Sequence, residues 1–352
     1  MNLIKKTTIV LTSAIALSSF AIAGNNDRAG QAGASELLVN PWARSSGWGN
    51  VNVSGAKGVE SMFMNVAGLS FARKPEVYFS HTQWLKGSDI SINSAGFVTG
   101  VGESGALGIS LMAMSFGDVQ ITTVENPEGG IGYYTPQFFN LGVSYAKSFS
   151  KSIKGGATVR IISESIANVK SSGVAFDAGI QYITGWNEEE DNLKFGLTLK
   201  NVGSPMRYSG DGLSFRGNPP VESNYQMTLE QRADRFELPS VMGIGASYDW
   251  KLAENHTLTT AGAFYSNSFT NDQFCFGLEY SFKKLFSLRG GYIMEKDAGN
   301  EDNTFTASKG MSGGATVELP LGKGGKKLGI DYSYRATHFF DGTHSFGLRL
   351  SL

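Results

Sequence analysis

The sequence predicts an all-β protein: a transmembrane antiparallel β-barrel of about fourteen strands with an N-terminal hatch segment. Three observations support this fold class. From residue 76 onward, the strand-like segments are mostly longer than the roughly five to six residues usual in soluble proteins. Several alternate apolar with polar residues. The long links between them are all odd-numbered along the chain, so they lie at the same end of the barrel, as the external loops of an outer-membrane barrel do.

The predicted strands are residues 76–84, 88–100, 105–118, 137–149, 153–165, 173–184, 193–202, 239–250, 256–269, 272–282, 286–296, 310–319, 326–336 and 344–352. In 139–149, Phe139, Leu141 and Val143 lie on one face, and polar or small residues lie on the other. The same two-residue period runs through 193–199 and 326–336. Apolar residues facing outward and polar residues or glycine facing inward are typical of a transmembrane barrel.

The links give an independent check. All links longer than ten residues are odd-numbered when the links are counted from the first strand. They are 119–136, 203–238 and 297–309. Outer-membrane barrels have short periplasmic turns and long external loops. We therefore expect the odd-numbered links to be external. The last strand ends on Leu352, so it can pair with the first strand and leave no open edge.

The N-terminus predicts export. Lys5 and Lys6 precede an apolar stretch over residues 9–22, and Ala21–Ala23 supplies a small-residue cleavage site, so residues 1–23 are predicted to be a signal peptide. The alternative, a membrane anchor, needs a longer apolar span. No later apolar run predicts a transmembrane helix. Residues 24–75 are rich in small residues and are expected to fold into the lumen as a hatch, and residues 76–352 are expected to form the barrel.

Composition agrees with this reading. The chain has 45 Gly and 9 Pro, and 12% of its residues are aromatic. Removing residues 1–23 leaves 28 basic and 31 acidic residues, a net charge of about −3, which is too balanced to indicate a nucleic-acid partner. The single Cys275 cannot form an internal disulfide and is expected to be a packing residue.

The segment 40–71 resembles the N-terminal hatch of the PorV/PorQ family, which belongs to the wider FadL-like barrels. The matching residues are Ala43, Arg44, Gly47, Trp48, Gly49, Asn65, Gly68 and Leu69. Val66 stands where the family usually has Pro. The resemblance implies a fourteen-stranded outer-membrane barrel of the type IX secretion system. One branch of the family shuttles secreted proteins that carry a C-terminal sorting domain, and another anchors a surface component.

Several motifs have simpler interpretations. The GxGxxG match at 100–105 precedes a strand and not a helix, so it indicates a turn and not a dinucleotide site. GKGGKK (322–327) is expected to be a basic periplasmic turn, with lipid headgroup contact as an alternative. EEED (188–191) is expected to be an acidic turn. DAGNEDN (297–303) lacks the spacing of a calcium loop.

No catalytic, metal or cofactor-binding residues are predicted, and we expect the protein not to be an enzyme. The four His residues are scattered without a zinc-like spacing, and no G-x-S-x-G elbow is present. Paired acids across the barrel, as in barrel hydrolases, stay open because no sequence spacing can reveal them.

The long external links carry the predicted partner contacts: Tyr133, Tyr134, Tyr208, Phe215, Tyr225 and Phe236. Long loops are usually functional, and aromatic side chains outside a barrel suit protein recognition. The alternative is a lid that folds over the mouth of the barrel.

We therefore expect a monomeric barrel in the outer membrane of a Gram-negative bacterium. Its expected role is a non-enzymatic component of type IX secretion, with outer-membrane lipid, secretion or attachment proteins and cargo C-terminal domains as partners, and no nucleic acid. The alternative is a FadL-like transporter of hydrophobic small molecules. The predicted inner faces carry Arg160, Asp177, Asp331 and Arg349, which weighs against an apolar conduit. A diffusion porin ranks third, because the hatch argues against it.

Overall fold

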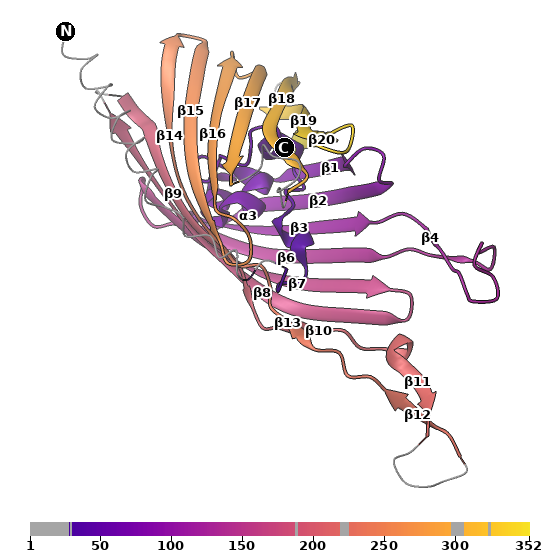
Figure 1. The fold of residues 1–352 in the computed structure, drawn as a ribbon. Coiled ribbons are helices and arrows are strands. Elements are labelled where there is room, and N and C mark those ends of the chain that lie inside the picture. The colour runs from indigo at the N-terminus through magenta and orange to yellow at the C-terminus, as the bar shows by residue number, and fades with distance from the viewer. Residues whose placement is uncertain (1–27, 29, 187–188, 219–224, 297–305, 323–324) are drawn as a thin grey trace.

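A computed structural model describes residues 28, 30–186, 189–218, 225–296, 306–322 and 325–352. Fourteen antiparallel strands close into one barrel (Figure 1). In barrel order they are β1 (Glu76–Trp84), β2 (Ile90–Val101), β3 (Gly105–Ser115), β6 (Gln137–Ser148), β7 (Ile153–Ile166), β8 (Val169–Trp186), β9 (Glu189–Gly203), β14 (Val241–Ala253), β15 (His256–Asn267), β16 (Gln273–Phe282), β17 (Phe286–Glu295), β18 (Ser308–Leu321), β19 (Lys326–Thr337) and β20 (Thr343–Ser351).

Each predicted strand corresponds to one barrel strand, so the predicted fold class is confirmed. The largest differences are in β8 and β9, which extend beyond the predicted 173–184 and 193–202 because their alternation continues through polar residues. The predicted closure is also confirmed. β20 pairs with β1 in antiparallel register, with Phe79 opposite Leu348. Closure removes the two open edges that a flat sheet would expose.

The wall has the two faces that its sequence period predicts. In β6, Phe139 and Val143 are exposed, whereas Asn140 and Ser144 are buried against the interior. Large apolar side chains cover the outer surface on every side, for example Phe79, at 55% exposed. An apolar exterior around a polar interior is the arrangement that a barrel needs in lipid.

Two long links form arms at one end of the barrel (Figure 1). The first carries β4 (Val119–Gln120) paired with β5 (Tyr133–Tyr134). The second carries β10 (Met206–Arg207) paired with β13 (Arg235–Phe236), the short helix η5 (Asp211–Leu213), and the hairpin of β11 (Ser214–Gly217) and β12 (Met227–Glu230). We call this end the arm end. The links at the opposite end, such as 102–104 and 283–285, are short turns.

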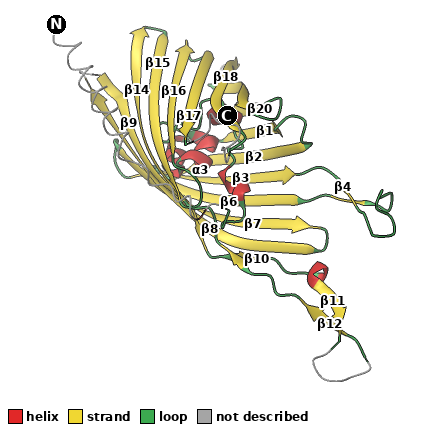
Figure 2. Cartoon of the chain, viewed as in Figure 1, coloured by secondary structure: helices red, strands yellow, loops and turns green. Residues whose placement is uncertain are grey.

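The segment before β1 forms short helical pieces inside the curve of the strands (Figure 2). They are η2 (Ser35–Leu38), α2 (Ala43–Ser46), η3 (Gly58–Glu60), α3 (Ser61–Met64) and η4 (Val66–Phe71). Glycines interrupt this segment often, which keeps each helix short. In the described part of the chain, no helix is both long and apolar enough to span a membrane.

Candidate functional site

The N-terminal segment packs tightly against the inner wall. Trp42, Val51, Val59 and Leu69 are almost fully buried and belong to a core shared with lumen-facing residues of the strands. Trp42 stacks on Tyr78 of β1, with ring centroids 5.0 Å apart. The segment therefore acts as the core of the barrel over much of its height.

Lumen-facing glycines make room for this segment. A Cβ at Gly291 in β17 would lie 2.5 Å from the carbonyl carbon of Trp48, and a Cβ at Gly277 in β16 would lie 2.6 Å from the Trp48 ring. Real Cβ atoms do not approach so closely, so these positions require glycine. Inner-wall glycines at which a Cβ would come within 3.3 Å of this segment include Gly96, Gly108, Gly156, Gly179, Gly196, Gly245, Gly277, Gly291 and Gly314.

The predicted hatch residues all lie within this packed region. Ala43, Trp48, Asn65 and Leu69 are buried, and Gly68 directly faces the carbonyl oxygen of Ala56. Gly47 and Gly49 lie against the backbones of β18 and β17. The Arg44 guanidinium pairs with Glu279 of β16 at 3.3 Å. The motif thus provides small residues for close approach, together with polar residues for bonds to the wall.

Asn65 makes the most bonds among these residues. Its side-chain oxygen accepts a hydrogen bond from the backbone N–H of Ala67 at 3.2 Å, which caps η4. Its amide nitrogen donates to the carbonyl oxygens of Val53 (3.0 Å), Ile180 (3.0 Å) and Leu197 (3.2 Å). The last two belong to β8 and β9, so one side chain joins the segment to two wall strands.

Charged groups inside the lumen form ion pairs. Arg160 and Asp177 are both buried and lie 2.6 Å apart, and Arg160 also donates to the carbonyl oxygen of Met62 at 2.7 Å. Arg289 pairs with Glu279 at 2.8 Å, and Arg349 pairs with Glu318 at 2.8 Å. Arg160, Asp177, Asp331 and Arg349 therefore face the interior, as the sequence predicts.

A cavity of about 280 Å³ lies in the lumen toward the arm end. Phe63, Met64, Trp84, Tyr265 and Ile293 form much of its lining. Two cations also line it: the Lys200 ammonium lies 4.4 Å from the centre of the Phe63 ring, and the Arg335 guanidinium lies 4.7 Å from that of Trp84. Within the described residues, Nε and Nη2 of Arg335 have no hydrogen-bond partner.

Neither Lys200 nor Arg335 was predicted from the sequence to be a site residue. Each occupies an inward-facing position of its strand. The feature that could have identified them is a charged residue at an inward-facing position of 193–202 or 326–336. The two-residue alternation of a strand does not by itself show which inward-facing residues border a cavity and which contact the hatch.

The six predicted partner contacts fall into two groups. Tyr133, Phe215 and Tyr225 are well exposed on the arms. Tyr134, Tyr208 and Phe236 are half-buried. The rings of Tyr208 and Phe236 lie 5.4 Å apart at the base of the second arm, and the Tyr208 hydroxyl donates to Glu164. Burial, and then the hydrogen bond to Glu164, raises the pKa of Tyr208.

Of the remaining motif predictions, the acidic turn at 188–191 is wrong for Glu189, Glu190 and Asp191, which begin β9. The acidic loop 297–303 lies outside the described residues, as does part of the basic turn 322–327. Among the residues that the structure describes, no group of three or more His, Cys, Asp or Glu side chains could hold a metal ion. Cys275 is buried in the core of the barrel, where it packs as predicted.

A closed antiparallel barrel with an apolar exterior and a polar, filled interior belongs to the class of membrane-spanning β-barrels. Among solved structures, the chain is similar to the Pseudomonas putida toluene transporter TodX, with a TM-score of 0.56 and 10% identity over 89% of this chain and 97% of that one. It is also similar to a Pseudomonas aeruginosa FadL homologue, with a TM-score of 0.51 and 12% identity over 87% and 96% of the two chains.

The chain therefore shares its fold with TodX and with this FadL homologue. No protein-family profile matches the sequence, and no curated protein matches it. At these identities the likeness concerns the fold.

Proposed function

We propose that this protein is a non-enzymatic outer-membrane barrel that binds a protein partner through its arms and serves type IX secretion. The observation that carries this proposal is the exposed apolar surface of the arms. Tyr133 and Phe215 are 66% and 53% exposed, well away from the apolar belt of the wall. Exposed aromatic side chains outside the membrane favour protein recognition.

The exposed apolar surface is clearest on the β11–β12 hairpin. Phe215 lies opposite Leu229, and Gly217 opposite Met227, so these residues share one face. Arg216 and Thr228 lie on the other face. A lone two-stranded hairpin gains little stability in water. A partner that covers Phe215 and Met227 would remove apolar area from water and stabilise the hairpin.

The base of this arm is held in place. Arg28 pairs with Glu237 at 3.0 Å, and the backbone N–H of Gly33 donates to the Glu237 carbonyl at 3.1 Å. The N-terminal segment therefore joins the arm base to the hatch, which favours a preformed binding surface.

The filled lumen supports binding over conduction. The inner-wall glycines and the hydrogen bonds of Asn65 hold the hatch against the wall, and the buried Arg160–Asp177 ion pair bonds the hatch at the Met62 carbonyl oxygen. The resemblance of the hatch motif to the PorV/PorQ family supports the type IX role. The partner would then be a secreted protein with a C-terminal sorting domain, or a surface attachment component.

The test is a mild-detergent pull-down of the tagged protein from its native outer membrane, followed by mass spectrometry. We expect secreted proteins with a common C-terminal domain, or translocon subunits. The Phe215→Ser/Met227→Ser variant should lower their recovery about tenfold or more, as loss of interface anchors does. The matched control, Ser214→Ala/Thr228→Ala, changes the opposite face and should leave recovery unchanged. A monomer carrying only lipid or fatty acid would refute the proposal.

The second candidate is a transporter of hydrophobic small molecules, and the comparisons support it more directly than the secretion role. TodX is described as a toluene transporter, and its fold is the one seen here. The cavity beside Phe63, Met64 and Trp84 is the observation in this chain that favours it. These aromatic and apolar residues line one part of the cavity, and polar groups such as Lys200, Glu295 and Arg335 line the rest, a mixture that small-molecule sites commonly have.

A variant that fills the luminal cavity with a larger side chain distinguishes the transporter function from the secretion function. Met64→Trp should abolish retention of an apolar probe such as toluene by the purified protein, measured by native mass spectrometry. Met242→Trp, the same change on the outer wall, should leave retention intact. If the unmodified protein retains no toluene, the transporter reading loses its support.

A further inference from the structure

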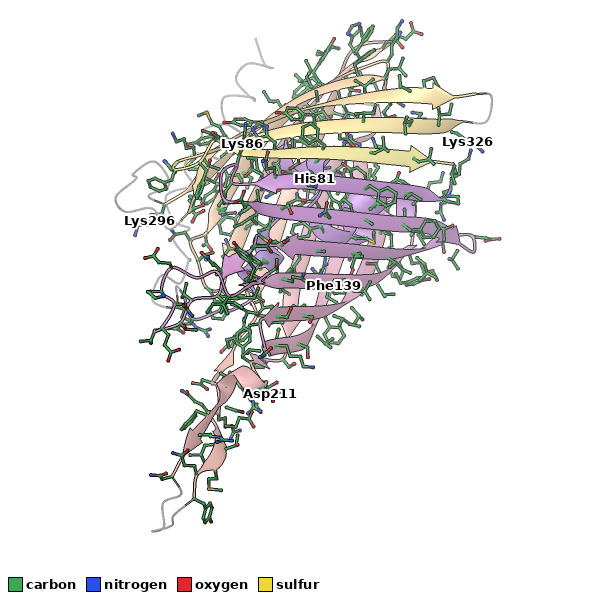
Figure 3. All side chains as sticks on the ribbon, turned by 90° about the vertical axis from the view of Figure 1, so that its right-hand side faces the viewer. His81, Lys86, Phe139, Asp211, Lys296 and Lys326 are labelled. Atoms are coloured by element: carbon green, nitrogen blue, oxygen red, sulfur yellow. The ribbon has the colours of Figure 1, made fainter. Side chains whose placement is uncertain are left out.

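Two polar residues lie on the outer wall beside large apolar side chains. His81 of β1 and Asn93 of β2 are directly opposite in register, and both are exposed. Their Nδ1 and Oδ1 atoms lie 2.8 Å apart, within hydrogen-bond distance. Figure 3 shows His81 on the wall between the two ends of the barrel.

The pair borders a hollow of about 550 Å³ on the outer surface. Phe79, Leu111, Phe346 and Leu348 stand around the hollow, and small residues, such as Ala95 and Ala113, form part of its floor. A hollow of this size on the outer wall, with apolar side chains around it, suits an acyl chain.

The pair adjoins large apolar side chains of the outer wall: Phe79 stands two residues before His81 in β1, and Phe346 pairs with His81 from β20. His81 comes three residues before Trp84, the end of β1 at the arm end. At about 3.3 Å per residue and a tilt of about 40°, this puts His81 roughly 7–8 Å below the end of the strand. Polar side chains on the lipid face destabilise a barrel in proportion to their depth, so such a pair calls for a bonding partner.

The hydrogen-bonding capacity of the pair defines that partner. When Nδ1–H of His81 donates to Asn93, Nε2 of His81 is left as an acceptor and the Asn93 amide nitrogen as a donor. Neither has another partner within the described residues. A group that both donates and accepts, such as a hydroxyl or a secondary amide, would satisfy both atoms.

A second hollow on the outer wall, over β16 and β17, provides a comparison. It measures about 610 Å³ and presents Phe276, Leu278 and Leu288 to the lipid, with Gly290 in its floor. Small residues therefore make a hollow at both places. His81 bonds Asn93 beside the first hollow, whereas beside the second the Tyr280 hydroxyl lies 2.6 Å from Nδ1 of His256, so the two hollows offer different hydrogen-bonding groups.

We propose that the hollow at His81 and Asn93 binds a membrane lipid whose acyl region carries an amide or hydroxyl group. The chain lies along Phe79 and Leu348, and the amide or hydroxyl bonds the His–Asn pair. This site is separate from the arms and from the luminal cavity, so it does not depend on which function those serve.

The test compares two lipids with the same phosphocholine headgroup. Sphingomyelin has an amide and a free hydroxyl at the top of its chains, and phosphatidylcholine has only esters. The protein is placed in nanodiscs containing equal amounts of both, and the lipids that it retains are counted by native mass spectrometry. We expect about three- to tenfold more sphingomyelin, the gain from one or two hydrogen bonds in a membrane.

His81→Leu/Asn93→Leu should bring the ratio of the two lipids to about one. Leu278→Ala, in the second hollow, should leave the preference unchanged. Because the double variant makes the lipid face more apolar, its thermal unfolding in phosphatidylcholine nanodiscs should occur at the same or a higher temperature, which verifies its fold. Equal retention of both lipids by the unmodified protein, or an unchanged preference in the double variant, overturns the proposal.

Discussion

The side-chain amide of Asn65 donates to the carbonyl oxygen of Ile180, 115 residues further along the chain, at 3.0 Å. The strand that carries Ile180 already uses its backbone in the ladder of the wall. The Asn65 bond is therefore an addition that fixes the hatch to the wall between β8 and β9. Gly179, which precedes Ile180 in β8, has no side chain, and the Asn65 side chain occupies the space that a Cβ there would fill.

Asn65→Asp separates the capping role of this residue from its bonds to the wall. Aspartate can still accept from the Ala67 N–H, but it cannot donate to the three carbonyl oxygens. We expect destabilisation of about 3 kcal/mol or more, because a buried carboxylate would face carbonyl oxygens. Urea unfolding in detergent micelles measures it. Asn65→Ser should cost less, and an equal cost for both variants would contradict this account.

Gly291→Ala should displace the hatch. Its Cβ would meet the backbone of Trp48 at 2.5 Å, and a backbone contact of this kind cannot be relieved by rotating a side chain. We expect higher conductance in planar bilayers and a shift in tryptophan fluorescence. The adjacent Gly290→Ala is the control, since its nearest neighbour would be 3.9 Å away. Matching conductance of the two variants would show that the hatch tolerates the added carbon.

Arg160→Met should destabilise the barrel by about 3–5 kcal/mol, because it leaves Asp177 buried without its cation. Arg160→Met/Asp177→Leu should recover part of this loss, although Asp177 also accepts from the backbone N–H of Asn201 at 2.8 Å. A double-mutant cycle on unfolding free energies, completed with Asp177→Leu, measures the coupling. A coupling energy near zero would mean that the two charges are each compensated elsewhere.

Glu36→Gln should stabilise the protein at neutral pH. Burial, together with the nearby Glu164 charge, raises the pKa of Glu36 above its ordinary value. A raised carboxyl pKa favours folding below the unfolded-state pKa, and this advantage is lost as pH rises through the folded-state pKa. The unfolding temperature of the variant should therefore exceed that of the unmodified protein at pH 7 and converge with it near pH 4. A constant difference across this range would exclude titration of Glu36 as the cause.

Much of the barrel could be predicted from local patterns. The two-residue period locates a strand and assigns its faces from neighbouring residues alone, so Phe139, Asn140 and Arg160 were assigned to the correct sides. The lengths of the links follow directly from the bounds of the strands that the period locates. The ends of β8 and β9 were missed because polar residues continue those strands beyond the apolar period.

Contacts between distant segments could not be predicted in this way. Arg44 and Glu279 are 235 residues apart, and they meet only because the barrel closes around the hatch with a particular register. Likewise, the sequence marks Tyr208 and Phe215 alike as aromatic residues of one long link. Packing at the arm base half-buries Tyr208 against Phe236, whereas Phe215 stays exposed on the hairpin.

The sequence by itself determined the strands and their faces, because each depends on residues a few positions apart. Tertiary structure decided which inward glycines receive the hatch, which charges pair, and where a cavity or an exposed surface is left. Those outcomes depend on the register between strands and on the volume inside the closed barrel, which no local pattern in the chain encodes.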